Sequence, residues 1–252
     1  GSASAKSRAT EGFSAMTRVF TRSTLANARN GTVRGKTARR RRGNVTIACP
    51  MVSPFYLFAA SVSWPFVKGL YRLRATGVEN VPEGGMVLAA NHTSNFDPWP
   101  LGMPLFPERQ LRFMAKAELF NPLLTPLLRA GGAFKVRRGE SDVEAMRTAT
   151  ELARQGEIVV MFPEGTRQTK GLRKKHVAKA HTGAARIALN AGVPLVPAAI
   201  SGTDRLTRLG PLRVAYGEPI DLSDLDGLDV KEASARATER LMAKIEELKA
   251  LT

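Results

Sequence analysis

A histidine and an aspartate, His92 and Asp97, lie five residues apart in a polar stretch that directly follows the apolar run Met86 to Ala90. A short apolar run bounded by turn residues is typical of a buried strand. The polar stretch then lies at the carboxyl end of that strand, where open α/β sheets bind their ligands. An imidazole can exchange a proton near neutral pH, and a carboxylate can orient it and support its charged form. The pair therefore predicts general-base chemistry.

The spacing of the two residues also predicts a turn between them. In one continuous helix, residues five apart would point about 140° away from each other. Pro98 agrees with a turn, because proline disfavours helical backbone at the residue before it, here Asp97. The alternative is that Asp97 only caps a helix that begins at Pro98.

A second polar motif, Phe-Pro-Glu-Gly-Thr-Arg, follows another apolar run, Ile158 to Met161. Taken together, the motifs resemble those of the glycerolipid acyltransferase family, which includes the 1-acyl-sn-glycerol-3-phosphate (lysophosphatidic acid) acyltransferases. The likeness extends over roughly residues 70 to 220. The residues that carry it are Asn91, His92 and Asp97 (Asn-His-x4-Asp), Gly132 to Gly139, Phe162 to Arg167, and Val193 to Pro197.

The resemblance implies transfer of an acyl group from a thioester of coenzyme A or acyl carrier protein to the sn-2 hydroxyl of lysophosphatidic acid, giving phosphatidic acid. His92 would be the base and Asp97 its support. We expect no covalent acyl-enzyme, because no Gly-x-Ser-x-Gly elbow occurs, and we expect neither metal nor cofactor. By the same resemblance, the acceptor would be bound by Asn91, Glu164, Gly165, Thr166 and Arg167, with help from Arg138 or its neighbour Arg137.

Other functions remain open on the sequence. A related acyltransferase could use glycerol 3-phosphate or another lysophospholipid as its acceptor. A third possibility is a member of the family that tethers to membranes without turnover. A non-enzyme alternative is a basic nucleic-acid-binding protein, although the chain lacks an aromatic-basic RNA motif and a helix-turn-helix pattern. We therefore expect no nucleic-acid partner.

The charge of the chain favours anionic partners. The 252 residues have a formal net charge of +16, and residues 1–50 hold eleven Lys or Arg against one acid, which is +10 of that total. Such a balance suits phospholipid surfaces or nucleic acid. A single cysteine, Cys49, excludes an internal disulfide, and three histidines are too few for a rich metal cluster.

The amino-terminal part divides into two expected segments. Residues 1–43 form a basic leader that we expect to be disordered, and that also resembles an organellar transit peptide. Residues 44–70 form an expected membrane-associating helical segment, uncharged from 44 to 67, and rich in aromatic residues. Because Pro50, Pro54 and Pro65 argue against one straight span, we expect a helix in the membrane interface. The alternative is a helix that covers the core. The expected location is the cytoplasmic face of the cell membrane, or an organelle if the leader targets one.

Residues 71–252 form the expected catalytic domain. Strands and helices alternate there, which predicts an α/β fold with a mixed, largely parallel sheet flanked by helices. The leucine stripe between 119 and 128 would pack as core or line an acyl-chain groove. The expected strands are 72–79, 86–90, 111–115, 134–137, 157–162, 193–200 and 212–216, and the expected helices are 120–130, 141–154, 183–190 and 231–250.

Overall fold

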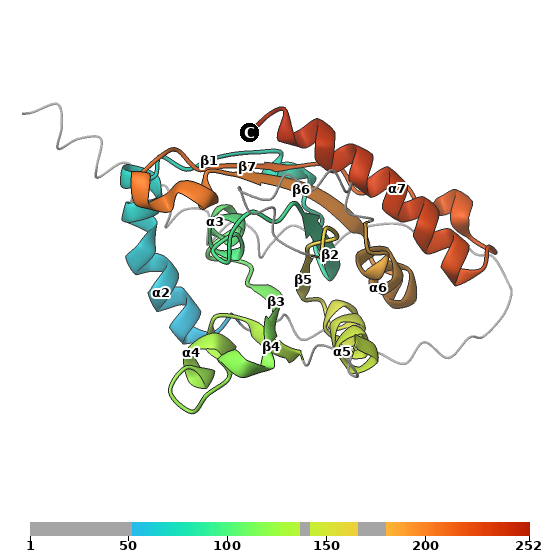
Figure 1. Ribbon diagram of the computed structural model, residues 1–252, viewed down its shortest axis with the longest axis horizontal. Helices are drawn as coiled ribbons and strands as arrows, with labels where there is room; N and C mark the ends of the chain where they lie inside the picture. The colour runs from blue at the N-terminus through green and yellow to red at the C-terminus, as the bar shows by residue number, and fades with distance from the viewer. Residues whose placement is uncertain (1–51, 137–141, 166–179) are drawn as a thin grey trace, which may run out of the picture. The chain divides into compact units, whose positions relative to one another are not determined.

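The computed structural model describes residues 52–136, 142–165 and 180–252, all within the compact unit Thr46–Thr252 (Figure 1). These residues form a seven-stranded sheet of order β1-β7-β6-β2-β5-β3-β4. The strands are β1 (Arg74–Thr76), β2 (Met86–Ala90), β3 (Leu111–Lys116), β4 (Ala133–Val136), β5 (Ile158–Met161), β6 (Leu195–Ser201) and β7 (Arg213–Tyr216).

Five neighbouring strands, from β6 through β2, β5 and β3 to β4, run parallel. Strand β7 is antiparallel to β6, and β1 pairs parallel with β7. The predicted mixed, largely parallel sheet flanked by helices is therefore confirmed. Strand β2 has a parallel partner on each side, with Leu88 opposite Val160 and Val196, and all five of its residues are buried.

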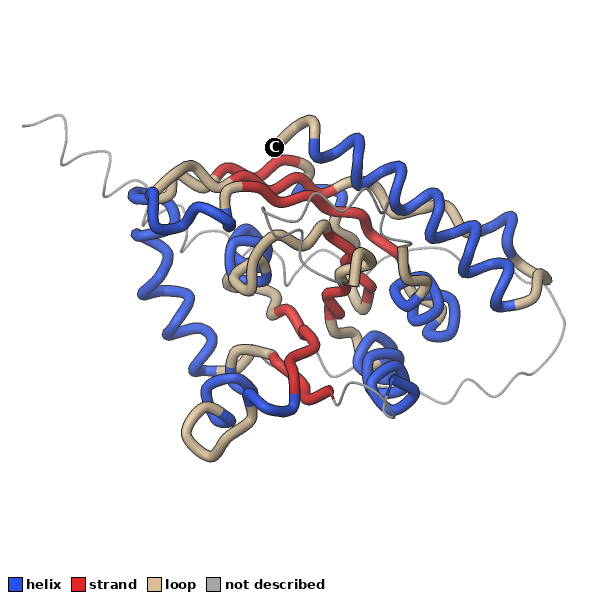
Figure 2. Tube along the Cα trace, in the orientation of Figure 1, coloured by secondary structure: helices blue, strands red, loops and turns tan. Residues whose placement is uncertain are grey.

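Helices lie on both faces of the sheet (Figures 1 and 2). One face is covered by α5 (Asp142–Arg154), α6 (Gly183–Ala191) and α7 (Val230–Lys249). The other is covered by α2 (Pro54–Pro65) and α3 (Pro98–Gly102), with α4 (Thr125–Ala130) in contact with α2. Shorter helical turns are η1 (Phe66–Leu70), η2 (Val78–Asn80), η3 (Met103–Leu105), η4 (Ala117–Leu119), η5 (Thr203–Arg208) and η6 (Ser223–Leu225).

The two layers of core follow from the alternation of side chains along the strands. On β2, Met86 and Leu88 belong to the core beneath α2 and α3, whereas Val87 and Ala89 belong to the core beneath α5, α6 and α7. The helix expected at 231–250 is confirmed as α7, and it packs on the sheet through its buried residues Ala233, Ala237, Leu241, Ile245 and Leu248.

The leucine stripe does not pack as core, so that one of its two interpretations was wrong. The helix expected from residue 120 begins only at Thr125, with Pro126 in its first turn. Leu123 is 85% exposed and Leu127 is 49% exposed. Proline is tolerated in the first turn of a helix but not in its interior, so the prolines shorten this helix.

Helix α2 has two different faces. Ala60 of α2 and Val67 of η1 are buried in the core, as the covering-helix alternative predicted. Phe58, Val62 and Phe66 are 67%, 52% and 57% exposed. Within the described residues, every helix is too short or too polar to cross a bilayer. The predicted leader, residues 1–43, lies outside the described part of the chain, and the predicted boundaries at 43 and 70 stay predictions.

Candidate active site

The loop that follows β2 carries the candidate catalytic pair, and Asn91 at its start is fixed to β6. The Asn91 side chain donates from Nδ2 to the carbonyl of Ile200 at 2.9 Å and accepts at Oδ1 from the Ile200 N–H at 2.8 Å. Its side chain is buried. Both polar groups of the carboxamide are thus used inside the protein, and the predicted contact of Asn91 with the acceptor stays a prediction.

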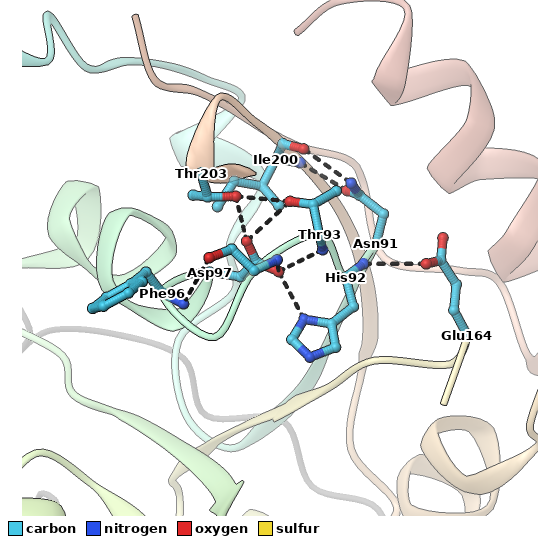
Figure 3. Close-up of polar contacts among 9 residues, drawn as sticks. Asn91, His92, Thr93, Phe96, Asp97, Glu164, Ile200 and Thr203 are labelled. Atoms are coloured by element: carbon cyan, nitrogen blue, oxygen red, sulfur yellow. Dashed lines mark hydrogen bonds and ion pairs between the residues drawn. The ribbon is translucent and has the colours of Figure 1, made fainter. Parts of the chain in front are cut away.

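The imidazole of His92 and the carboxylate of Asp97 face each other (Figure 3). Nδ1 of His92 lies 2.7 Å from Oδ2 of Asp97. Asp97 is fully buried, whereas the His92 side chain is 18% exposed. Among the described residues, the hydrogen bond between the His92 ring and the protein is made by Nδ1. Nε2 is therefore available to a hydroxyl group. The turn predicted between the two residues is confirmed.

Three donors besides His92 bond the Asp97 carboxylate. Oδ2 accepts from the N–H groups of Thr93 at 2.7 Å and Ser94 at 2.9 Å. Oδ1 accepts from the hydroxyl of Thr203 at 2.5 Å, and the Thr93 hydroxyl lies 3.2 Å from the same oxygen. Burial alone would raise the pKa of Asp97, but the hydrogen bonds from His92, Ser94, Thr203 and Thr93 outweigh it and lower that pKa below its usual value.

Two expectations about Asp97 were wrong. Its carboxylate makes no capping hydrogen bond to α3, so the capping alternative fails. Its backbone is helical, with φ −53° and ψ −40°, although Pro98 follows. The turn that its carboxylate closes, together with the bond from the Asp97 N–H to Ser94 O at 3.2 Å, outweighs the local preference set by the proline.

Residues after β5 complete the surroundings of His92. The Phe162 ring stacks on the imidazole, with centroids 4.1 Å apart and planes tilted by 17°. Oε2 of Glu164 accepts from the backbone N–H of His92 at 3.3 Å. Burial raises the pKa of Glu164, against the opposing effect of that hydrogen bond. Two motifs far apart in sequence are thereby joined at one edge of the sheet, where parallel strands β2 and β5 both end.

Gly165 closes a turn with Phe162 and has a φ of +68°, which favours glycine. Its predicted contact with the acceptor stays a prediction. A Cβ at this position would lie 2.4 Å from the His181 ring. The backbone N–H of His181 donates to Pro163 O at 2.8 Å, so this histidine packs against the motif.

Several predicted residues lie outside the described part of the chain. These are Arg137, Arg138, Thr166 and Arg167, together with the lysine-rich run from 170 to 179. Sequence reasoning in turn missed Thr93 and Thr203 on Asp97, and two cations near Phe162, Lys116 and Arg186. The signal for Thr203 was present, because it follows the apolar strand β6 at the same edge of the sheet as His92.

Two cavities adjoin this site. One, of about 370 Å³, is mostly apolar, and its wall includes Asn95, Phe96 and Pro98 from the His92 loop. Its other lining residues are Tyr56, Ala59, Ala60, Ser63, Trp99, Met103, Leu111, Phe113 and Gly131. Its walls include residues of α2 and α3 but none of the leucine stripe 119–128. The acyl-chain groove expected along that stripe stays a prediction.

The second cavity, of about 550 Å³, lies beside Phe162 and Gly165 and is lined by the cationic side chains of Lys116 and Arg186. The Phe162 ring that lines this cavity also stacks on His92, so the imidazole is linked to the apolar cavity through its own loop and to the cationic cavity through Phe162.

Comparisons with known proteins agree with this geometry. A family model described as Acyltransferase matches residues 72–201. A 1-acyl-sn-glycerol-3-phosphate acyltransferase of Bacillus subtilis is 36% identical over 175 residues, which cover 68% of this chain and 84% of that protein. A chloroplastic protein of the same name from Arabidopsis thaliana is 28% identical and matches 73% of this chain, which spans 52% of its length.

A solved structure is also similar. The crystal structure of the 1-acyl-sn-glycerophosphate (LPA) acyltransferase PlsC from Thermotoga maritima matches with a TM-score of 0.51 and 26% identity, over 78% of this chain and 88% of that one. The sheet, the paired motifs and these matches define an enzyme that transfers acyl groups. The chain belongs to the Acyltransferase family, and it is an O-acyltransferase.

Proposed function

We propose that this enzyme moves a fatty acyl group from an acyl thioester to the sn-2 hydroxyl of 1-acyl-sn-glycerol 3-phosphate, making phosphatidic acid. The observation that carries the proposal is the His92–Asp97 pair, whose Nδ1 and Oδ2 lie 2.7 Å apart. Residues of the His92 loop line a mostly apolar cavity, and Phe162, which stacks on His92, lines a cationic one. The relatives named for this activity support it. Coenzyme A and acyl carrier protein are both retained as carriers of the acyl group, and no metal or cofactor is invoked.

The chemistry follows from the roles of the two ring nitrogens. Asp97 accepts a hydrogen bond from the N–H at Nδ1 of His92, so the lone pair of Nε2 points outward as the base. Nε2 takes the proton of the acceptor hydroxyl as its oxygen attacks the thioester carbonyl, and Asp97 stabilises the imidazolium that forms. The carbon–sulfur bond then breaks, and the leaving thiolate takes the proton back from Nε2, which releases a thiol and restores the neutral imidazole. The hydroxyl attacks directly, so no acyl group is attached to the protein.

The cationic cavity fits the phosphate of the acceptor. Lys116 and Arg186 offer an ammonium and a guanidinium, the groups that proteins use for phosphate. The predicted arginines Arg137, Arg138 and Arg167 would add to them. A carboxylate repels phosphate, and Glu164 already bonds the His92 backbone. Its role in this proposal is therefore to hold the His92 loop.

The apolar cavity fits an acyl chain, because its aromatic and aliphatic walls begin at the His92 loop. The exposed apolar faces of α2 and the 119–128 stripe fit a membrane surface, where both lipids reside. This combination favours lysophosphatidic acid over glycerol 3-phosphate, which has no chain to bury. Membership of an enzyme family contradicts the non-enzyme alternative, and the expected absence of a nucleic-acid partner stays a prediction.

The decisive experiment measures thioester consumption with a panel of acceptors, comparing the wild-type enzyme with His92→Ala. The panel contains lysophosphatidic acid, lysophosphatidylcholine and glycerol 3-phosphate, each with acyl-coenzyme A and with acyl carrier protein. We expect lysophosphatidic acid to give the highest kcat/KM. The variant should lose turnover by roughly three orders of magnitude or more, as catalytic units do without their base.

A higher kcat/KM for another acceptor would reassign the substrate within the family. Equal rates for the wild type and His92→Ala, or a trapped acylated protein, would reject the mechanism. Vesicle binding should survive in His92→Ala, and an unfolding temperature equal to that of the wild type would show that the variant is folded.

A further inference from the structure

Asp97 is held on one side by its own loop and on the other by a distant residue. Oδ2 accepts from His92 Nδ1 and from the N–H groups of Thr93 and Ser94. Oδ1 accepts from hydroxyl groups, and the shorter of these bonds, 2.5 Å, comes from Thr203, which lies 106 residues further along the chain. Within the described residues, Thr203 is the donor to this carboxylate that comes from outside the loop.

The direction of the hydroxyl bonds can be worked out. Oγ1 of Thr93 lies 2.7 Å from Oγ1 of Thr203 and 3.2 Å from Oδ1 of Asp97. Each hydroxyl has one proton, and an ionised carboxylate can only accept. The shorter bond assigns the Thr203 proton to Asp97, so Thr93 donates to Thr203. A chain of two hydroxyls therefore ends on the carboxylate (Figure 3).

Thr203 is itself firmly placed. Its side chain is 2% exposed, and it begins η5 immediately after β6. The preceding Gly202 has a φ of +90°, and a Cβ there would lie 2.4 Å from the carbonyl of Pro211. Because β6 pairs with β2 and also bonds Asn91, the hydroxyl is held by the same framework that carries His92.

We propose that Thr203 is a positioning residue of the acyl transfer, which locks the rotation of the Asp97 carboxylate so that Oδ2 stays on Nδ1 of His92. This proposal rests on the proposed roles of His92 and Asp97. Without the hydroxyl, the carboxylate can turn about its bond to Cβ. The imidazole then loses the partner that keeps its proton on Nδ1 and its lone pair on Nε2.

The kinetic consequence is specific, because Thr203 lines neither of the two cavities that adjoin the site. Thr203→Val keeps the shape and removes the hydroxyl. We expect kcat to fall by about tenfold to a hundredfold, the range for losing a hydrogen bond to a charged group, while KM for donor and acceptor stays unchanged. Thr203→Ser restores the hydroxyl and should stay within about twofold of the wild type.

The matched control is Thr238→Val. Thr238 on α7 is also a buried threonine whose hydroxyl donates, to Ser234 O at 2.6 Å, but it touches no part of the site. Thr238→Val should therefore leave kcat unchanged. Thermal unfolding shows which variants fold, and Thr203→Ala replaces Thr203→Val if the latter does not.

A second measurement needs no substrate. The chain has three histidines, so ¹⁵N-imidazole NMR at a pH of about 8, where an ordinary imidazole is neutral, can follow the His92 tautomer once His92→Gln identifies its signals. The wild type and Thr203→Ser should carry the proton on Nδ1, and Thr203→Val should show a mixture with the Nε2 form.

The proposal is overturned if Thr203→Val keeps the wild-type tautomer and kcat, or if Thr203→Ser loses as much activity as Thr203→Val. It is also overturned if KM changes in place of kcat. If the wild type prefers another acceptor, the proposed function fails while the tautomer measurement still decides the role of Thr203.

Discussion

The carboxamide of Asn91 and the peptide group of Ile200 form two hydrogen bonds in opposite directions, at 2.9 and 2.8 Å, so a side chain takes the place of a strand partner at the end of β2. Asn91→Leu removes both hydrogen bonds and leaves the buried N–H and C=O of Ile200 without partners. We expect a loss of about 1–3 kcal/mol for each unsatisfied group, measured by urea unfolding. Asn91→Asp can still accept a hydrogen bond from the Ile200 N–H, so it should lose less stability than Asn91→Leu. A stability of Asn91→Leu equal to that of the wild type would contradict the structural role.

The stability of the protein should respond to pH in opposite directions through Asp97 and Glu164. The pKa of Asp97 is lowered in the folded state, so the stability that it contributes is present above its ordinary pKa and is lost as pH falls through the lower folded value. The pKa of Glu164 is raised, so its contribution is present below its ordinary pKa and is lost as pH rises through the higher folded value.

Urea unfolding of Asp97→Asn, Glu164→Gln and the wild type from acid to neutral pH separates the two effects. The stability of Asp97→Asn relative to the wild type should fall as pH rises, whereas that of Glu164→Gln should increase. Parallel curves for both variants would contradict the opposite shifts.

Filling the apolar cavity should shorten the preferred acyl chain. Ala59 on α2 lines this cavity, and Ala59→Phe would occupy part of it. Each buried CH₂ contributes about 0.8 kcal/mol, roughly fourfold in kcat/KM. A series of acyl thioesters in detergent should therefore show its maximum shifted to shorter chains. Ser61→Phe adds the same ring at an exposed position of α2 outside the cavity, and its chain-length profile should match that of the wild type.

Membrane binding should depend on the exposed face of α2. Phe58 is 67% exposed, and replacing it with aspartate removes an apolar anchor and adds a repulsive charge. We expect at least a tenfold weaker association with anionic vesicles in a sedimentation assay, consistent with about 1.5–3 kcal/mol for one buried aromatic side chain. Val143 of α5 is 80% exposed on the other face of the sheet, so Val143→Asp should bind like the wild type. Equal binding by Phe58→Asp and Val143→Asp would place the membrane contact elsewhere.

Local patterns were enough to predict most of the sheet and the central pair. Strand β2 is an uninterrupted apolar run, and a parallel strand buried on both faces requires such a run. The motif after β5 was predictable because β5 is also an uninterrupted apolar run. The loops that follow β2 and β5 meet because these parallel strands end at the same edge of the sheet.

Other features depend on contacts that no local pattern contains. Asp97 has helical backbone against the preference imposed by Pro98, because its carboxylate is bonded by partners from two loops. The leucines from 119 to 128 are as apolar as core residues, yet most of them are exposed, because the helix that was expected to bury them begins only at Thr125. Thr203 has no motif of its own, and its role follows only from the pairing of β6 with β2.

The position of β2 also has a consequence for how the chain is made. Its two neighbours in the sheet, β5 and β6, begin at Ile158 and Leu195, so β2 leaves the ribosome long before either of its hydrogen-bonding partners has been synthesised. Pairings so distant in sequence form slowly and leave apolar segments exposed to aggregation. A nascent chain that stops before Thr203 contains His92 and Asp97 but lacks the hydroxyl that bonds the Asp97 carboxylate. We therefore expect full activity only late in translation, after the central sheet can close.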